Sequence, residues 1–221
     1  MGCKTYSRLY HACVCPVLDY SSEIWGAKDY QKIDSIQNRA IRVYLGVHNY
    51  AANVAINGDM GWTTSQVRPQ IVLRFWNRLV NMDENRLTKA IFDWDRNICC
   101  KNWSSDVKTL MNSIDFQDNF NEILPVSLNS AWSLLHEKFT INWKEKLQNT
   151  PKLRTYKIFK EIYCTEFYVT SCLNRRQKST MAKLRCGILP LETETGRWRS
   201  APVEERLCKL CNDDIENEIH F

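Results

Sequence analysis

Apolar residues recur at helical spacing in three long stretches of this chain. The first stretch runs from Asp29 to Gly46, and its apolar positions are Ile33, Ile36, Ala40, Ile41 and Tyr44. Intervals of three and four residues place such positions on one face of an α-helix. The pattern therefore predicts an amphipathic helix with Asp29 as its N-cap and Gly46 as its C-terminal stop.

A second helix is predicted to begin after Ser65. Its inner stripe consists of Val67, Ile71, Val72, Phe75 and Leu79. Arg74 and Arg78 are four residues apart, so they lie together on the flank of this helix. Pro69 suits the first turn, where a missing amide proton costs no hydrogen bond.

A third helix is predicted from the apolar positions Trp132, Leu135, Phe139, Trp143 and Leu147, which follow one another at three and four residues. Asn149-Thr150-Pro151 ends it and is the predicted boundary between two subdomains. Between Met82 and Leu124 the spacing is irregular, which predicts short helices and a loop.

The second half of the chain is basic. Residues 151–211 contain 13 Lys and Arg against 6 Asp and Glu, whereas residues 1–150 contain 17 against 15. A basic helix is predicted from about Ser171 to Cys186, with Gly187 as its cap. With only 7 Gly and 6 Pro in 221 residues, the composition favours a mostly α fold.

Basic and aromatic side chains in this half could bind nucleic acid. The candidate residues are Arg175, Arg176, Lys178, Lys183, Arg185, Arg197, Trp198 and Arg199. The cations could neutralise phosphates, and the indole could stack on a base. The alternative is a solvated helix face beside a core tryptophan, which the composition supports equally well.

A candidate metal site lies near the C-terminus. Cys208, Cys211 and His220 have the spacing C-x2-C-x8-H, in which two thiolates and an imidazole can converge on one zinc ion. Tetrahedral zinc requires a fourth ligand, and the chain ends at Phe221, so the sequence predicts an incomplete site. The alternatives are a chance pair among ten cysteines and a redox pair, which would need a βαβ context.

The remaining patterns exclude several classes of protein. No run of about 18 apolar residues and no apolar signal core is present, which predicts a soluble chain in the cytoplasm or nucleus without membrane contact. The scattered cysteines predict free buried thiols rather than disulfides. Asp213-Asp214 has the setting of a solvated turn rather than of a polymerase site, and no nucleophile or phosphate-binding motif is found, so neither an enzyme nor a small-molecule substrate is expected.

Motifs at both ends of the chain carry a resemblance to a known family. Cys15–Trp25 includes Pro-Val-Leu, Tyr, Ser-Glu and Trp, and Ile36–Gly46 contains Gln-Asn-Arg-Ala followed by Leu-Gly. The later motifs are Pro151–Tyr156, Leu184–Leu191, Glu194–Arg197 and Glu205–Phe221. Together they resemble the region that follows the polymerase core in LINE-type, non-LTR retrotransposon reverse transcriptases.

The resemblance implies three roles along the chain. Residues 1–150 would be a thumb-like helical region that packs along template and primer, with Arg39 and Arg42 as contacts. Residues 151–203 would be a basic helical linker that holds template RNA, and residues 204–221 a zinc knuckle truncated before the last ligand of the usual Cys-Cys-His-Cys set. The catalytic aspartates of the family lie upstream of these motifs, so polymerase activity is not expected.

The predicted fold is therefore mostly α, a compact multi-helix body with a short, truncated, zinc-knuckle-like C-terminal hairpin. The predicted function is non-catalytic binding of template RNA or an RNA/DNA duplex, with zinc as the one cofactor. The alternatives are an eroded retroelement fragment without independent activity and a co-opted helical protein-interaction domain.

Overall fold

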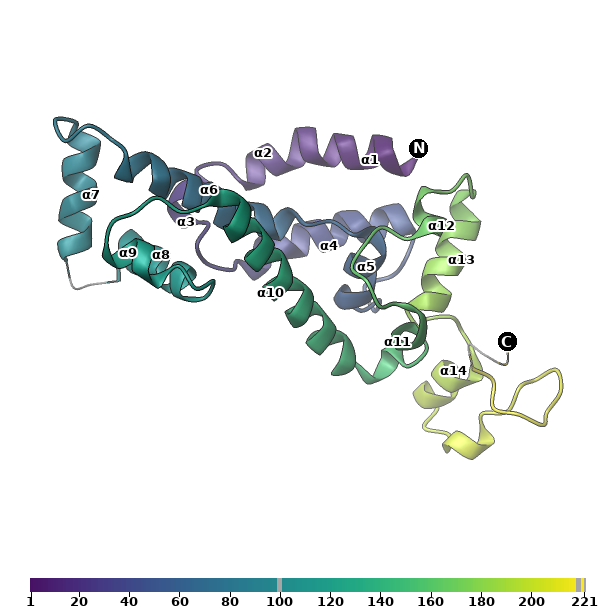
Figure 1. The fold of residues 1–221 in the computed structure, drawn as a ribbon. Coiled ribbons are helices and arrows are strands. Elements are labelled where there is room, and N and C mark those ends of the chain that lie inside the picture. Colours follow the sequence, from purple (N-terminus) through teal and green to yellow (C-terminus); the bar gives the residue numbers. More distant parts are fainter. Residues whose placement is uncertain (99–100, 218–219, 221) are drawn as a thin grey trace. The chain divides into compact units, whose positions relative to one another are not determined.

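The computed structural model is mostly helical, which confirms the predicted mostly α fold (Figure 1). It describes residues 1–98, 101–217 and 220. The α-helices are α1 (Cys3–Leu9), α2 (Cys15–Leu18), α3 (Ser22–Trp25), α4 (Gln31–Leu45), α5 (Asn53–Met60), α6 (Thr64–Val80), α7 (Leu87–Asn97), α8 (Trp103–Asn112), α9 (Gln117–Asn121), α10 (Leu128–Gln148), α11 (Tyr156–Phe159), α12 (Phe167–Thr170), α13 (Arg175–Arg185) and α14 (Glu192–Trp198). The turn Tyr10–Val14 is π-helical, and Pro151–Leu153 and Val203–Glu205 form 3-10 turns.

The chain packs into two compact units that are interleaved in sequence. Unit 1 contains residues 1–8, 35–62 and 142–221, and unit 2 contains residues 9–34 and 63–141. The predicted subdomain boundary at Asn149-Thr150-Pro151 ends α10 but lies inside unit 1. Compact packing in this chain therefore joins segments that are far apart in sequence.

The core of unit 2 forms around α6. Trp76 is fully buried, stacks on Phe120 with ring centroids 5.2 Å apart, and meets Phe92 edge-on at 5.4 Å. Its indole Nε1 donates a hydrogen bond to the carbonyl oxygen of Leu124 at 3.0 Å. Side chains of α7, α8, α9 and α10 complete this cluster. The region between Met82 and Leu124 therefore contains short helices, as predicted, and they pack on α6.

A buried arginine links α6 to the first segment of unit 2. Arg68 is 5% exposed and donates to Asp19 Oδ1 from Nε at 2.8 Å. Its guanidinium also lies over the Trp25 ring, 5.8 Å from the centroid. The ion pair and the aromatic contact together satisfy a charge that would otherwise be costly to bury.

In unit 1, the backbone carbonyls of α5 accept hydrogen bonds from much later residues. Trp143 Nε1 donates to Val54 at 2.9 Å, the Tyr156 hydroxyl to Ala55 at 3.1 Å, and the Thr165 hydroxyl to Met60 at 2.9 Å. α5, the end of α10 and the segment that follows it therefore form one hydrogen-bonded layer. Gly61 permits their close approach: it has φ +64, and an added Cβ would lie 2.4 Å from the Thr165 amide nitrogen.

Asp59 lies at the centre of this layer with no exposed surface. Arg185 donates hydrogen bonds to both carboxylate oxygens, from Nε to Oδ2 at 2.9 Å and from Nη2 to Oδ1 at 2.7 Å. The hydroxyls of Tyr156 and Tyr168 donate to the same two oxygens at 2.9 and 2.7 Å. Burial and the neighbouring Asp59 raise the pKa of both tyrosines, so they remain protonated donors. The buried charge is therefore fully paired.

The helix α4 differs from its prediction at its start and in the face it buries. It begins at Gln31, so Asp29 is not its N-cap. Ile36 is 44% exposed, whereas Gln37 and Asn38 are buried. Asn57 of α5 explains why these two polar side chains are buried, because it donates to Asn38 Oδ1 at 2.7 Å and accepts from Gln37 Nε2 at 3.3 Å. Paired carboxamides can be buried where unpaired ones cannot.

Helix ends follow the predicted glycines. α4 stops before Gly46, which has φ +68, and α13 stops before Gly187, which has φ +61. The amides of Gly187 and Ile188 donate to Leu184 and Lys183, the pattern of a Schellman motif. α13 begins later than predicted, because a reciprocal capping box between Asn174 and Gln177 starts it at Arg175. Pro69 lies in the second turn of α6 rather than the first.

No helix in the described part of the chain is long and apolar enough to cross a membrane.

Candidate metal centre and basic surface

A tight loop brings the two cysteines of the C-x2-C motif together. Leu207 and Ile215 form an isolated antiparallel bridge at its base. Inside the loop, the Cys208 amide donates to Asp214 at 2.8 Å, and the Asn212 amide donates to Cys208 at 2.8 Å. Asn212 takes a left-handed conformation with φ +60, which asparagine tolerates well. The loop is therefore closed by its own backbone.

His220 completes a three-residue cluster. The ligand atoms of Cys208, Cys211 and His220 lie within 4.8 Å of one another, and His220 Nε2 is 3.2 Å from Cys211 Sγ. Hydrogen bonds from the backbone amides of Asp214 and Asp213 lower the pKa of the Cys211 thiol to about 7. Because metals bind the thiolate, this shift prepares Cys211 to act as a ligand.

The spacing of these donors suits a single metal ion. Two thiolates at about 2.3 Å from a tetrahedral zinc are roughly 3.8 Å apart, so a group spanning 4.8 Å needs only a small contraction. The other ring nitrogen of His220, Nδ1, lies 3.9 Å from Asp214 Oδ2. A carboxylate behind a ligating imidazole orients the ring. The cluster can therefore hold a metal ion through three ligands. The neighbouring Glu218 and Ile219 of the predicted knuckle, and Phe221, lie outside the described residues.

The loop is anchored to α14. The Thr193 amide donates to the Glu216 carbonyl at 3.2 Å, and the Glu192 amide donates to the Glu216 carboxylate at 2.8 Å. Lys209, inside the loop, pairs with Glu192 Oε1 at 2.7 Å. This hydrogen bond from Lys209, aided by the charge of Arg199, lowers the pKa of Glu192. The metal-binding loop and α14 therefore form one small structure.

Arg206 holds the base of the same small structure. Its guanidinium donates to the carbonyls of Ala201 and Thr193 at 2.8 and 3.2 Å. Gly196 allows this approach, because an added Cβ would lie 2.7 Å from Arg206 Cγ. Neither Arg206 nor Glu216 could be recognised from the sequence pattern, since their partners are backbone groups.

Two of the predicted phosphate-binding residues, Lys178 and Arg185, form hydrogen bonds inside unit 1. Arg185 is held by Asp59, as described above. Lys178 is 7% exposed and donates to the Tyr44 hydroxyl and the Val169 carbonyl, both at 3.1 Å. A phosphate could reach either cation only if these contacts were broken. We therefore assign both residues to the fold.

Three others of the set remain available on α13. Arg175 and Arg176 are exposed and Lys183 is half-buried, and none of the three forms a side-chain ion pair within the described residues. Arg175 and Arg176 occupy the first turn of the helix, where the macrodipole favours anions over cations. Their position is mildly unfavourable for the fold alone and favourable for binding an anion.

The last three members of the set lie at the exposed end of α14. Arg197 pairs with Glu194 at 2.9 Å, and Arg199 pairs with Glu192. The two arginine side chains are 52% and 60% exposed, although the carboxylates that they pair with are buried, so a phosphate could contact the outer side of each guanidinium. Trp198 is 75% exposed, with its ring free to stack on a base.

The cysteines of the described residues are all free thiols, as predicted, but only Cys3, Cys186 and Cys208 are buried. The arginines implied as thumb contacts differ from each other. Arg39 is exposed, whereas Arg42 donates to the Ala51 carbonyl at 3.0 Å. Arg42 therefore has a structural contact, and Arg39 has no such side-chain contact with the described residues.

No family model, curated protein or solved structure matches this chain.

Proposed function

We propose that this chain is a non-catalytic, nucleic-acid-binding segment of a LINE-type reverse transcriptase that holds template RNA or an RNA/DNA duplex. The observation that carries the proposal is the cluster of Cys208, Cys211 and His220 in a loop anchored to α14. The far end of the same helix presents Arg197, Trp198 and Arg199 to solvent. A metal ion that rigidifies the loop would thereby fix a basic, aromatic surface.

The proposed cofactor is zinc. Cys208 and Cys211 would supply thiolates, and His220 would supply Nε2, with Nδ1 directed toward Asp214. Structural zinc stabilises small loops that lack a hydrophobic core of their own. These residues account for three of the four usual positions, and the fourth is open to water or another donor.

We expect the chain to bind one equivalent of Co²⁺ or Zn²⁺, and we expect Cys211→Ser to weaken that binding by at least tenfold. The physical reason is the loss of a thiolate that hydrogen bonds already favour. The measurement is a Co²⁺ titration followed by thiolate-to-metal absorption, with Zn²⁺ in competition. Cys172→Ser is the matched control, because Cys172 is an exposed cysteine outside the cluster. Equal Co²⁺ affinity in the two variants would contradict the assignment.

Phosphate binding is assigned mainly to α13. A phosphate near Arg175 and Arg176 would meet two cations that form no ion pair with other described residues, and the positive end of the helix dipole. Lys183 and the α14 arginines would extend this surface. Affinity should therefore arise from counterion release and depend strongly on salt.

For a structured RNA, the double variant Arg175→Ala/Arg176→Ala is expected to weaken binding. It should also reduce the slope of log affinity against log salt by about 1 to 2, because each arginine that meets a phosphate releases roughly one counterion. Fluorescence anisotropy across a salt series measures both quantities. Lys144→Ala/Lys146→Ala removes the same charge from exposed positions on α10 and serves as the control. An affinity that is insensitive to salt would overturn the proposal.

A second candidate function is a helical protein-interaction domain, and α7 favours it. Leu87, Ile91 and Trp94 are 77%, 54% and 66% exposed and share one face of that helix. An exposed apolar stripe of this kind is typical of a binding surface. RNA binding at background level, together with cooperative unfolding of the chain, would favour this candidate over the first. An eroded fragment would instead lack a cooperative transition both with and without zinc.

A further inference from the structure

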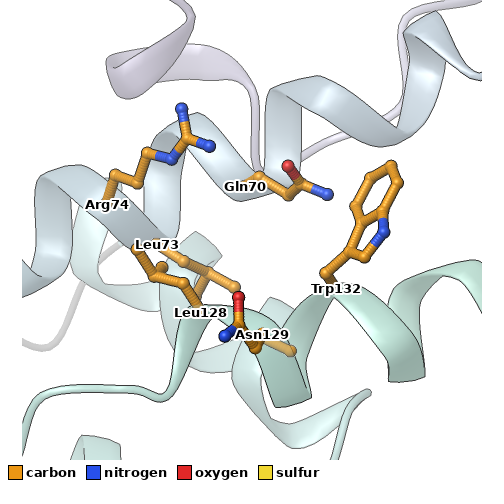
Figure 2. A pocket seen from close by; sticks show the side chains of 7 residues that line it. Gln70, Leu73, Arg74, Leu128, Asn129 and Trp132 are labelled. Carbon is orange, nitrogen blue, oxygen red and sulfur yellow. The ribbon is translucent and has the colours of Figure 1, made fainter.

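A groove of about 260 Å³ lies between α6 and α10 in unit 2 (Figure 2). Leu73 and Ala131, both fully buried, form its apolar side. Gln70, Arg74, Asn129 and Trp132 supply its polar and aromatic groups. Figure 2 shows Gln70 between Arg74 and Trp132, with its carboxamide directed toward the indole. The lining is thus a mixture of flat, hydrogen-bonding and cationic groups around a small apolar surface.

The side-chain amide nitrogen of Gln70 donates no hydrogen bond within the described residues. This atom, Nε2, is buried, and Gln66 Nε2 one turn earlier on α6 is likewise buried without a hydrogen-bond partner among the residues that the structure describes. Gln66 accepts or donates only at its other amide atom, 3.1 Å from His136 Nδ1. Exchanging N and O in either amide would leave the same position unpaired. Buried polar groups are normally satisfied, so an acceptor brought by a ligand in the groove would stabilise the Gln70 amide.

The indole of Trp132 offers a stacking surface beside this amide. The side chain is 36% exposed, and its ring stacks loosely on His136, with centroids 6.2 Å apart and planes 25° from parallel. Its Nε1 donates to no acceptor among the described residues. A planar ligand that entered the groove could therefore continue the stack and meet a hydrogen-bond donor.

Arg74, which could bind a phosphate, lies on the side of Gln70 away from Trp132 (Figure 2). Arg74 is exposed, and Arg78 follows one turn later on the same helix flank. Neither forms an ion pair or hydrogen bond through its side chain with the rest of the described chain. By contrast, Arg68 of the same helix is buried against Asp19. The two outer arginines are therefore available for an anion.

We propose that this groove binds one nucleotide of a single-stranded RNA. The base stacks on Trp132, the carboxamides of Gln70 and Asn129 meet its edge, and Arg74 with Arg78 binds the adjoining phosphates. An apolar protein side chain would leave the Gln70 amide unpaired, which is why a base fits better. The inference deepens the proposed function, on which it rests, by adding a base-contacting site in unit 2.

The test compares four homopolymeric RNA decamers with an abasic decamer of equal phosphate number, by fluorescence anisotropy at one salt concentration. At least one base-bearing decamer should bind about tenfold more tightly than the abasic one, since stacking is tolerant of sequence but requires a base. Gln70→Leu, which keeps the side-chain volume, and Trp132→Ala should each abolish that preference. Arg74→Ala should weaken both kinds of decamer by a similar factor.

Two matched variants control for charge and for tryptophan loss within unit 2. Arg86→Ala and Trp94→Ala alter exposed residues outside the groove and should preserve the preference. Asn129→Ala provides a second groove variant. Because Asn129 is exposed, this substitution should leave the fold intact.

Equal binding of base-bearing and abasic decamers, or no decamer binding, would overturn the groove proposal. Retention of the preference in Gln70→Leu and Trp132→Ala would overturn it as well, and would suit a groove that takes a protein side chain. The proposed function fails separately, when structured RNA binds without salt dependence or when Arg175→Ala/Arg176→Ala leaves its binding unchanged.

Discussion

Arg185→Ala is expected to lower the free energy of unfolding by about 3–5 kcal/mol, because it would leave the Asp59 carboxylate buried without its ion-pair partner. Asp59 has no exposed surface, and the two tyrosine hydroxyls that remain cannot neutralise its charge. The guanidinium also lies 4.5 Å from the centroid of the Phe159 ring, so packing is lost with the charge. Urea denaturation followed by circular dichroism measures the change.

Arg176→Ala is the control for this loss, because it removes an arginine from the exposed side of the same helix. It should change stability by no more than about 0.5 kcal/mol. The double variant Asp59→Ala/Arg185→Ala should cost less than the sum of the two single variants, since the second change removes the charge that the first leaves unpaired. A loss below about 1 kcal/mol in Arg185→Ala would show that Asp59 does not depend on this pair.

Trp76→Ala is expected to destabilise unit 2 by about 3–5 kcal/mol, as is usual when a fully buried aromatic side chain is truncated. The variant loses the stack on Phe120 and the edge contact with Phe92, and it leaves the Leu124 carbonyl without its indole donor. Loss of near-ultraviolet circular dichroism during urea unfolding reports the effect. Trp94→Ala removes a tryptophan that is 66% exposed, so its stability should match that of the unaltered chain. Equal losses in the two variants would place Trp76 outside the core.

The sequence predicted α6 and α10 well because their apolar residues keep helical spacing over several turns. The start and buried face of α4 could not be read in the same way. Its interior contains Gln37 and Asn38, whose partner Asn57 lies on another helix. Periodicity identifies an apolar face, but it cannot identify amides that are buried because a distant side chain satisfies them.

In the candidate site, too, contacts between residues close in sequence could be predicted, whereas contacts between distant residues could not. Cys208, Cys211 and His220 are close in sequence, and the fold brings them together as their spacing predicts. The basic pattern of its helix predicts a phosphate-binding role for Arg185, yet its partner Asp59 is 126 residues away in the sequence. The groove beside Gln70 also had no sequence signal, because α6 and α10 meet only in the folded unit.

The interleaving of the two units has a consequence for the order in which the chain folds during synthesis. Unit 2 has all of its residues once position 141 has been made, whereas unit 1 also needs residues 142–221. Until Tyr156, Tyr168 and Arg185 have been made, the Asp59 carboxylate has none of its side-chain partners and must stay in contact with water. A ribosome-bound chain therefore passes through a stage in which unit 2 has all of its residues. At that stage the N-terminal residues of unit 1 cannot yet pack against residues 142–221.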